Sequence, residues 1–277
     1  MSAKIQEKRT EELMSREALK TEPSRFVWYE LHTPDAGPAE AFYRGVLGWA
    51  AHDAGMPNRR YTLVTVAGIP IGGLLQKPAS GFASGEKAAW MGYIGVQDLD
   101  ASLQHLKQAN GVVHRTPEDI PGVGRFAVVS DPQGAIFVLF EPPKGVQQPE
   151  RPPAGTLGTA AWHDLAAADW QSDFNFYADL FGWSKSQAIE MGPNGVYQIF
   201  AVGSEPIGGM MTRMDPSQSP GWLFYFNVND INAAVGRVKQ HGGTVVHGPS
   251  VVPGGQQIAH CLDTQGAIFG IVGPPKQ

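Results

Sequence analysis

The sequence predicts an α+β fold made of two tandem βαβββ modules. The first observation behind this prediction is an internal repeat, because residues 24–142 and 157–275 carry the same residues in the same order. The second is that each copy opens with a strand-like segment and continues into a helix-like one. The third is that each copy closes on a hairpin turn sequence, Asp131-Pro-Gln-Gly in the first and Asp263-Thr-Gln-Gly in the second.

Matching residues are most frequent at the start of each copy and occur at intervals further along the chain. The first copy carries Trp28, Glu30, Leu31, Asp35, Phe42, Tyr43, Gly48 and Trp49, and the second carries Trp162, Asp164, Leu165, Asp169, Phe176, Tyr177, Gly182 and Trp183. Ile-Gly-Gly occurs at 71–73 and at 207–209, and Trp90 and Tyr93 return as Trp222 and Tyr225. Because order and spacing are both kept, we interpret the chain as a duplicated unit.

The elements follow in a fixed order within each copy. We expect a first strand at 26–32 and at 160–166, then a helix that ends at Gly48 or Gly182. At least three strands come next, and the Gly-Gly pairs within them suit a bulge or a tight bend. A second helix begins after Asp98 or Asp230, which are good N-caps, and ends at Gly111 or Gly242.

Two segments lie outside the repeat. Residues 1–23 form a charge-rich N-terminal extension, and residues 143–156 contain Pro143, Pro149, Pro152 and Pro153, which is typical of a semi-rigid linker. The domain prediction is therefore an extension at 1–23, a module at 24–142, a linker at 143–156 and a module at 157–275.

Composition excludes several classes of partner. A net charge of −5 provides no general attraction to nucleic acid or to anionic lipid, and no apolar run approaches the length of a membrane span. The first residues lack the apolar core of a signal peptide, and the single Cys261 fits a reducing compartment, so we expect a cytoplasmic protein. A monomer and a homodimer are both compatible with two modules in one chain.

The Phe-Tyr pair followed by Leu-Gly-Trp at 47–49 or Phe-Gly-Trp at 181–183, together with the hairpin turns, resembles the vicinal oxygen chelate superfamily. This superfamily contains glyoxalases, bleomycin-resistance proteins and extradiol dioxygenases, and both modules match it. Within it, the chain is most similar to the glyoxalase-like group of actinobacterial antigens and proposed hydroxylases. The resemblance implies curved mixed sheets around a pocket, where metal enzymes of the superfamily hold a divalent ion with His, Gln and Glu side chains.

The ligand positions of the superfamily carry other residues in this sequence. The resemblance places them at Trp28 and Trp162 on the first strands, at Val138 and Gly270 after the hairpins, and at Met91 and Leu223 before the second helices. None of these side chains is a credible ligand for a divalent metal. We therefore predict no cofactor at the usual positions.

Alternation along a strand places Trp28, Glu30 and His32 on one face, and we expect Trp162 and Asp164 to face the same pocket from the second copy. Tyr93 and Tyr225 should also point inward. Glu30 and Asp164 have a structural interpretation as buried partners of backbone or Tyr groups, and a functional one in which Glu30 is a general base or ligand anchor. A relocated metal site at Glu30, His32 and Asp164 is a further alternative.

The sequence thus predicts a protein that binds a small aromatic or hydrophobic molecule, with Trp28, Tyr93, Trp162, Asp164 and Tyr225 as ligand-binding residues. The alternative is an enzyme of lyase, hydroxylase or dioxygenase type, with Glu30 and His32 as its acid–base pair or with a displaced divalent metal. Loops at 77–88 and 212–221 lie at matching places in the two copies and are candidate lids.

Overall fold

The computed structural model describes residues 24–78, 88–145 and 151–275. The predicted N-terminal extension and most of the predicted lid at 77–88 lie outside these ranges. Within the described ranges, no helix has the length and apolar character needed to cross a membrane.

The first module contains two successive βαβββ units. Its elements are β1 (Phe26–Thr33), α2 (Ala36–Leu47), β2 (Ala50–Asp53), β3 (Tyr61–Val66), β4 (Ile69–Gln76), β5 (Ala89–Gly95), α3 (Leu99–Gln108), β6 (Val112–Ile120), β7 (Gly124–Ser130) and β8 (Ile136–Glu141). The tandem α+β prediction is confirmed, and the structure adds that the βαβββ order occurs twice in each module.

The second module repeats this order. Its elements are β9 (Ala160–Ala167), α4 (Trp170–Phe181), β10 (Ser184–Glu190), the short 3₁₀ helix η2 (Gly192–Asn194), β11 (Val196–Val202), β12 (Glu205–Thr212), β13 (Gly221–Asn227), α5 (Ile231–Gln240), β14 (Thr244–Val251), β15 (Gln257–Leu262) and β16 (Ile268–Gly273). The predicted lid at 212–221 is the mostly exposed connection between β12 and β13.

The helix boundaries follow from local sequence. Asp98 and Asp230 are N-caps whose side chains accept hydrogen bonds from backbone N–H groups of α3 and α5, and Gly48 ends α2 in the left-handed conformation. Helix α3 ends at Gln108, earlier than the predicted Gly111, because Asn110 already turns the chain there at φ 64°.

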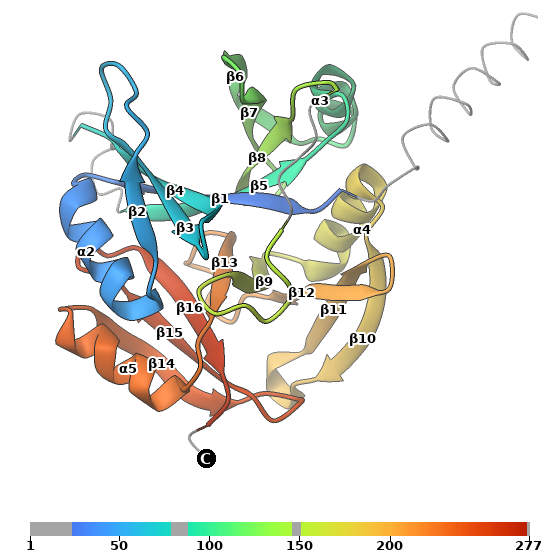
Figure 1. Cartoon of the computed structure of the whole chain (residues 1–277). Coiled ribbons are helices and arrows are strands. Elements are labelled where there is room, and N and C mark those ends of the chain that lie inside the picture. The colour runs from blue at the N-terminus through green and yellow to red at the C-terminus, as the bar shows by residue number, and fades with distance from the viewer. Residues whose placement is uncertain (1–23, 79–87, 146–150, 276–277) are drawn as a thin grey trace, which may run out of the picture.

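Each module forms one eight-stranded mixed sheet. The strand orders are β2-β3-β4-β1-β5-β8-β7-β6 and β10-β11-β12-β9-β13-β16-β15-β14, so equivalent strands occupy equivalent places. Both sheets are curved, and in Figure 1 the edge strands β6, β10 and β14 lie on the side away from the other sheet. The concave face of each sheet, called its inner face below, therefore points away from the other module.

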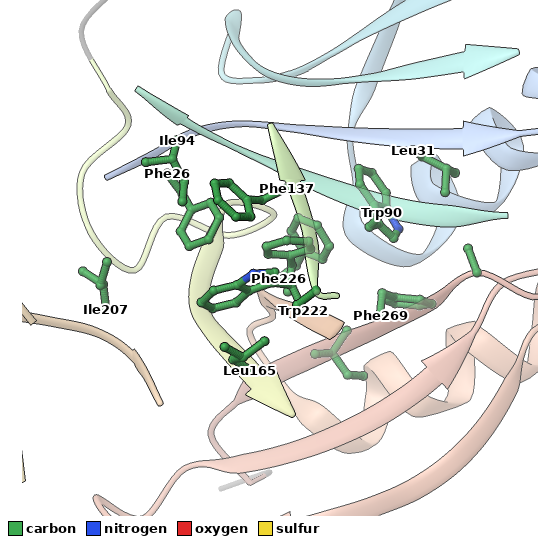
Figure 2. Packing of buried hydrophobic residues seen from close by; sticks show 14 of the residues in the cluster. Phe26, Leu31, Trp90, Ile94, Phe137, Leu165, Ile207, Trp222, Phe226 and Phe269 are labelled. Atoms are coloured by element: carbon green, nitrogen blue, oxygen red, sulfur yellow. The ribbon is translucent and has the colours of Figure 1, made fainter. Parts of the chain in front are cut away.

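The central strands of the two sheets face each other across a core of aromatic side chains. Phe26, Trp90, Trp222 and Phe226 pack together there, and Figure 2 shows them between the ribbons of the two modules. The ring centroids of Phe26 and Trp222 are 5.2 Å apart, and those of Trp90 and Phe226 are 5.4 Å apart. Aromatic pairs at these separations contribute beyond their buried area, so this face holds the modules together.

Residues that the two copies share form reciprocal hydrogen bonds between the modules. The Tyr43 hydroxyl donates to Asp263 at 3.2 Å, and the Tyr177 hydroxyl donates to Asp131 at 2.9 Å. Trp49 donates its indole N–H to the carbonyl of Gly158 at 2.7 Å, with an equivalent bond from Trp183 to Ser24 at 2.6 Å. The residues that carry the family resemblance thus pair the modules and lie away from the inner faces.

Candidate functional site

The first inner face is organised by β1. A β-bulge between Phe26 and Trp28 changes the phase of the strand, so Trp28, Glu30 and His32 point to the inner face while Tyr29 and Leu31 point to the core between modules. The predicted grouping of Trp28, Glu30 and His32 on one face agrees with this geometry.

Glu30 and His32 form a close pair. His32 Nε2 lies 2.7 Å from Glu30 Oε1, and the side chains are 9% (Glu30) and 18% (His32) exposed. The phenols of Tyr61 and Tyr93 lie near the Glu30 carboxylate, and the indole N–H of Trp28 donates to the Tyr61 hydroxyl at 3.1 Å. Burial, and secondly the negative charge of Glu30, raise the pKa of Tyr61 and of Tyr93 above the ordinary value, so both phenols stay protonated beside the carboxylate.

Tyr61 reaches Glu30 because a glycine pair on β4 makes room for it. A Cβ atom on Gly73 would lie 2.1 Å from the Tyr61 hydroxyl oxygen, and a Cβ on Gly72 would lie 2.5 Å from the carbonyl oxygen of Tyr29. A register irregularity does lie just before Gly72, as the bulge prediction requires. A second reason for glycine at these positions is close packing: the Tyr61 ring lies against Gly73, and the backbone of Tyr29 lies against Gly72.

An open pocket of about 680 Å³ adjoins this network. Its described lining residues are His32, Asn58, Arg59, Arg60, Leu75, Gln76, Lys77, Pro78, Met91, His114, Arg115, Val128 and Ile136. His32 and Met91 connect it to the Glu30 network, since Met91 is the cross-strand neighbour of Glu30. Trp28 and Tyr93 are outside the lining and pack with Phe126 and Val138 in an apolar cluster of the inner face, against which the lining residues Met91 and Val128 also pack.

The second inner face has an analogous network centred on Asp164. Its carboxylate accepts hydrogen bonds from the hydroxyls of Tyr197 at 2.5 Å and Tyr225 at 2.7 Å, and from the indole N–H of Trp162 at 3.1 Å. His260 Nε2 lies 2.7 Å from the Tyr225 hydroxyl oxygen. Burial raises the pKa of Asp164 even though the three donors act in the opposite direction.

The expectation that Trp162 and Asp164 face the same pocket as Glu30 is wrong. The two groups lie on the inner faces of two different sheets, because the modules pack through their other faces. The relocated metal site at Glu30, His32 and Asp164 is therefore not assembled.

The residues present do not fit the metal site of the superfamily. The positions that the resemblance assigns to ligands hold Trp28, Met91 and Val138, and Val138 is fully buried beside Tyr93. Among the residues that the structure describes, no three His, Cys, Asp or Glu side chains come together as a metal-binding group.

Several residues of these networks are not among the site residues predicted from the sequence. Tyr61 and Tyr197 complete the two carboxylate networks, and the repeated Ile-Gly-Gly was the signal for them, since each glycine pair accommodates one of these rings. In the first module an imidazole is supplied by His32 on β1, and in the second by His260 on β15. Because these strands are not equivalent, alignment of the two copies does not reveal that the two histidines correspond. Arg115 had no repeat partner of the same type.

His163 and Cys261 belong to the core. His163 lies between the Tyr29 hydroxyl, 2.6 Å from Nε2, and the Ile207 carbonyl, 2.5 Å from Nδ1, and burial lowers its pKa to about 4. Burial raises the pKa of Cys261 to about 12, which keeps the thiol protonated. Neither is a candidate for chemistry at the inner faces.

Comparison with known proteins identifies relatives along nearly the whole chain. The model of the Glyoxalase/Bleomycin resistance protein/Dioxygenase superfamily matches residues 25–139 and 159–271. CFP32 of Mycobacterium tuberculosis, which bears the name of a glyoxylase, is 29% identical over 256 residues, covering 90% of this chain and 95% of CFP32. The anthracycline biosynthesis protein DnrV of Streptomyces peucetius is 30% identical over 263 residues, covering 90% of this chain and 93% of DnrV.

Solved structures with the same fold are more distant in sequence. The Mn(II)-bound glyoxalase from Novosphingobium aromaticivorans superposes with a TM-score of 0.64 at 14% identity, covering 92% of this chain and 83% of that one. Homoprotocatechuate 2,3-dioxygenase from Arthrobacter globiformis superposes with a TM-score of 0.64 at 17% identity, covering 91% and 80%. With both modules matched by the family model, the chain belongs to the Glyoxalase/Bleomycin resistance protein/Dioxygenase superfamily.

Proposed function

We propose that this protein binds a small aromatic or hydrophobic molecule at the inner face of the first module, without a metal ion. The observation that carries the proposal is the open pocket of about 680 Å³ beside the Glu30–His32 pair. Its volume is in the range of small-molecule sites. The name of the Streptomyces peucetius relative, an anthracycline biosynthesis protein, is consistent with a small-molecule ligand.

The pocket combines apolar walls with polar side chains that are held by partners. Leu75, Met91 and Val128 supply apolar surface, and His32 is a polar lining side chain that Glu30 holds from behind. The Nε2 atom of His32 is engaged by Glu30 Oε1 at 2.7 Å, which leaves Nδ1 as the ring nitrogen for a hydrogen bond to a ligand. The Glu30 network thus orients His32, while Trp28 and Tyr93 support it from behind.

An acid–base enzyme is the second candidate function, because the 2.7 Å contact between Glu30 and His32 is the geometry of an oriented general base. In this case His32 Nδ1 takes a proton from the bound molecule, and Glu30 stabilises the imidazolium that forms. If turnover of a substrate is found by screening, Glu30→Gln should abolish it and leave binding intact.

Binding is tested with N-phenyl-1-naphthylamine, an uncharged aromatic probe whose fluorescence rises in apolar pockets. Met91→Trp fills the first pocket, and Leu223→Trp places the same side chain at the equivalent position of the second module. We expect Met91→Trp to weaken probe binding at least about tenfold, which corresponds to ~1.4 kcal/mol, and Leu223→Trp to leave it within twofold. Equal effects of the two variants, or no binding to the wild type, would contradict the proposal.

The cytoplasmic location and the choice between monomer and homodimer stay predictions from the sequence.

A further inference from the structure

We infer that Asn194 is a site of spontaneous covalent modification, at which the side-chain amide is lost and aspartate and isoaspartate are formed. Asn194 is followed by Gly195 in the turn that joins β10 to β11. This inference is independent of the proposed binding function, because it depends on the chemistry and the surroundings of the turn alone.

The reaction needs only the chain and water. The backbone nitrogen of Gly195 forms a bond to Cγ of Asn194 while the bond from Cγ to Nδ2 breaks, and the amide leaves as ammonia with the proton of the Gly195 N–H. Water then opens the cyclic imide that results. Hydrolysis of the bond from the nitrogen to Cγ gives aspartate, and hydrolysis of the bond from the nitrogen to the main-chain carbonyl carbon gives isoaspartate.

The surroundings of the turn leave both reacting groups open. Asn194 and Gly195 are exposed, the Asn194 amide has no hydrogen-bond partner among the described residues, and a Cβ atom on Gly195 would meet no non-neighbouring atom within 4 Å. One bond holds the Gly195 N–H, to the Gly192 carbonyl at 3.1 Å in the short helix η2. Hydrogen bonds of this 3₁₀ type have poor geometry and open readily at an exposed turn, which frees the nitrogen for attack.

A second Asn-Gly pair in the chain provides an internal control. Asn110-Gly111 is followed by valine, as Asn194-Gly195 is, and Asn110 is also exposed. The Gly111 N–H, however, donates to the Leu106 carbonyl at 2.8 Å, and a Cβ atom on Gly111 would lie 2.6 Å from Cγ of the buried Leu106. Close packing at the end of α3 therefore holds this nitrogen in place, so we expect Asn110 to be protected.

The equivalent turn of the first module lacks the reactive pair. Tyr61 and Tyr197 are equivalent residues of the two copies, so Asn194 corresponds to Asn58, which is followed by Arg59. A side chain on the residue that supplies the nitrogen hinders its approach to Cγ, whereas glycine leaves it open. The modification therefore adds a negative charge in the second module only, at the position where Asn58 lines the pocket of the first.

The experiment follows both Asn-Gly pairs in one sample. The full chain is incubated at mildly alkaline pH in native buffer and, separately, in guanidinium chloride. Proteolytic peptides that contain Asn194 or Asn110 are then quantified by mass spectrometry, which detects the replacement of the amide by a carboxyl group, and isoaspartate is detected with L-isoaspartyl methyltransferase. Asn194→Gln is the control variant, because it keeps an exposed amide while its longer side chain closes the ring far more slowly.

In native buffer we expect Asn194 to convert at least about tenfold faster than Asn110, which corresponds to ~1.4 kcal/mol. In guanidinium chloride the packing of Gly111 is lost, and the two rates should agree within about threefold. Asn194→Gln should abolish conversion at its own position and leave that of Asn110 unchanged. Equal rates in the native protein would overturn the inference, and so would a rate ratio that stays the same after unfolding.

Discussion

Two aspartates of the second module have opposite environments. Asp164 is surrounded by three hydrogen-bond donors, whereas neither carboxylate oxygen of Asp173 has a partner among the described residues, although its side chain is buried. Burial, and secondly the charges of Asp131 and Asp169, raise the pKa of Asp173 from 3.8 to about 8. Its counterpart in the first module is the buried Ala39, so the site accepts an apolar side chain.

The raised pKa of Asp173 predicts a pH-dependent gain of stability in Asp173→Ala. Because the folded-state pKa of about 8 is above the unfolded value of 3.8, the stability of the neutral form is fully present below about pH 4 and is lost as the pH rises to about 8. At pH 8 we expect Asp173→Ala to exceed the wild type by about 2–4 kcal/mol in urea unfolding, and the difference should shrink toward pH 4.

Glu190→Ala, which removes an exposed carboxylate of β10, is the control for this comparison and should change stability by less than about 0.5 kcal/mol at either pH. A wild type that is more stable than Asp173→Ala at pH 8 would show that the carboxylate has a stabilising partner.

The proposal that ligand binding needs no metal ion depends on individual residues of the first network. Only Glu30 and His32 supply ligand atoms of the usual types at the centre of the first network, and Met91 and Val138 occupy the neighbouring positions. Extensive treatment with EDTA should leave the affinity for N-phenyl-1-naphthylamine unchanged within twofold. A stoichiometric metal ion in protein purified without chelators, and its loss in Glu30→Ala, would contradict this expectation.

At the scale of elements, the glycine pairs of β4 and β12 hold each network together. A Cβ on Gly73 would lie 2.1 Å from the Tyr61 hydroxyl oxygen, and a Cβ on Gly209 would lie 2.0 Å from Cζ of Tyr197. The hydroxyl end of each tyrosine ring therefore lies against the backbone of the neighbouring strand. Only glycine allows the phenol to reach the carboxylate on the central strand.

Gly73→Ala should consequently destabilise the protein by about 1–3 kcal/mol, because the added methyl displaces the Tyr61 ring and breaks its hydrogen bond with Trp28. The measurement is the free energy of unfolding in urea. Gly236→Ala, in the exposed part of α5 with no atom within 4 Å of the added carbon, is the control and should stabilise by up to about 1 kcal/mol. Equal effects of the two substitutions would mean that Tyr61 is not tightly packed.

At the scale of the whole molecule, each hairpin turn supports a helix of the other module. Gln265 accepts a hydrogen bond from the N–H of Asp35 at 2.9 Å and donates one to its carbonyl at 2.7 Å. Gln133 makes the same two bonds to Asp169, at 2.7 and 2.9 Å. Asp35 and Asp169 are the N-caps of α2 and α4, so the turns fix the starts of these helices across the interface.

Gln265→Ala and Gln133→Ala should each lower the free energy of unfolding by about 1–2 kcal/mol, because two backbone groups lose their partners at the interface. Gln104→Ala removes an exposed glutamine of α3 and serves as the control. If the two hairpin variants match this control in urea unfolding, the hairpins do not contribute to the pairing of the modules.

The sequence predicted what depends on local or repeated features. The N-caps Asp98 and Asp230 and the first strands are set by neighbouring residues, and the inward direction of Trp28, Glu30 and His32 follows from alternation. Which face of a module packs against the other module depends on tertiary contacts that no local pattern shows. For this reason the expectation that Asp164 lies in the same pocket as Glu30 is wrong. The contribution of His260 and Arg115 depends on strand pairing between distant segments, and no local pattern marks it.

The central claim is that the first inner face binds the ligand, and a crystal structure of the full chain with 8-anilinonaphthalene-1-sulfonate tests it most directly. We predict density for the ring system against Met91 and His32. Density for the probe in the second inner face or between the modules, with the first pocket free of it, would contradict the account.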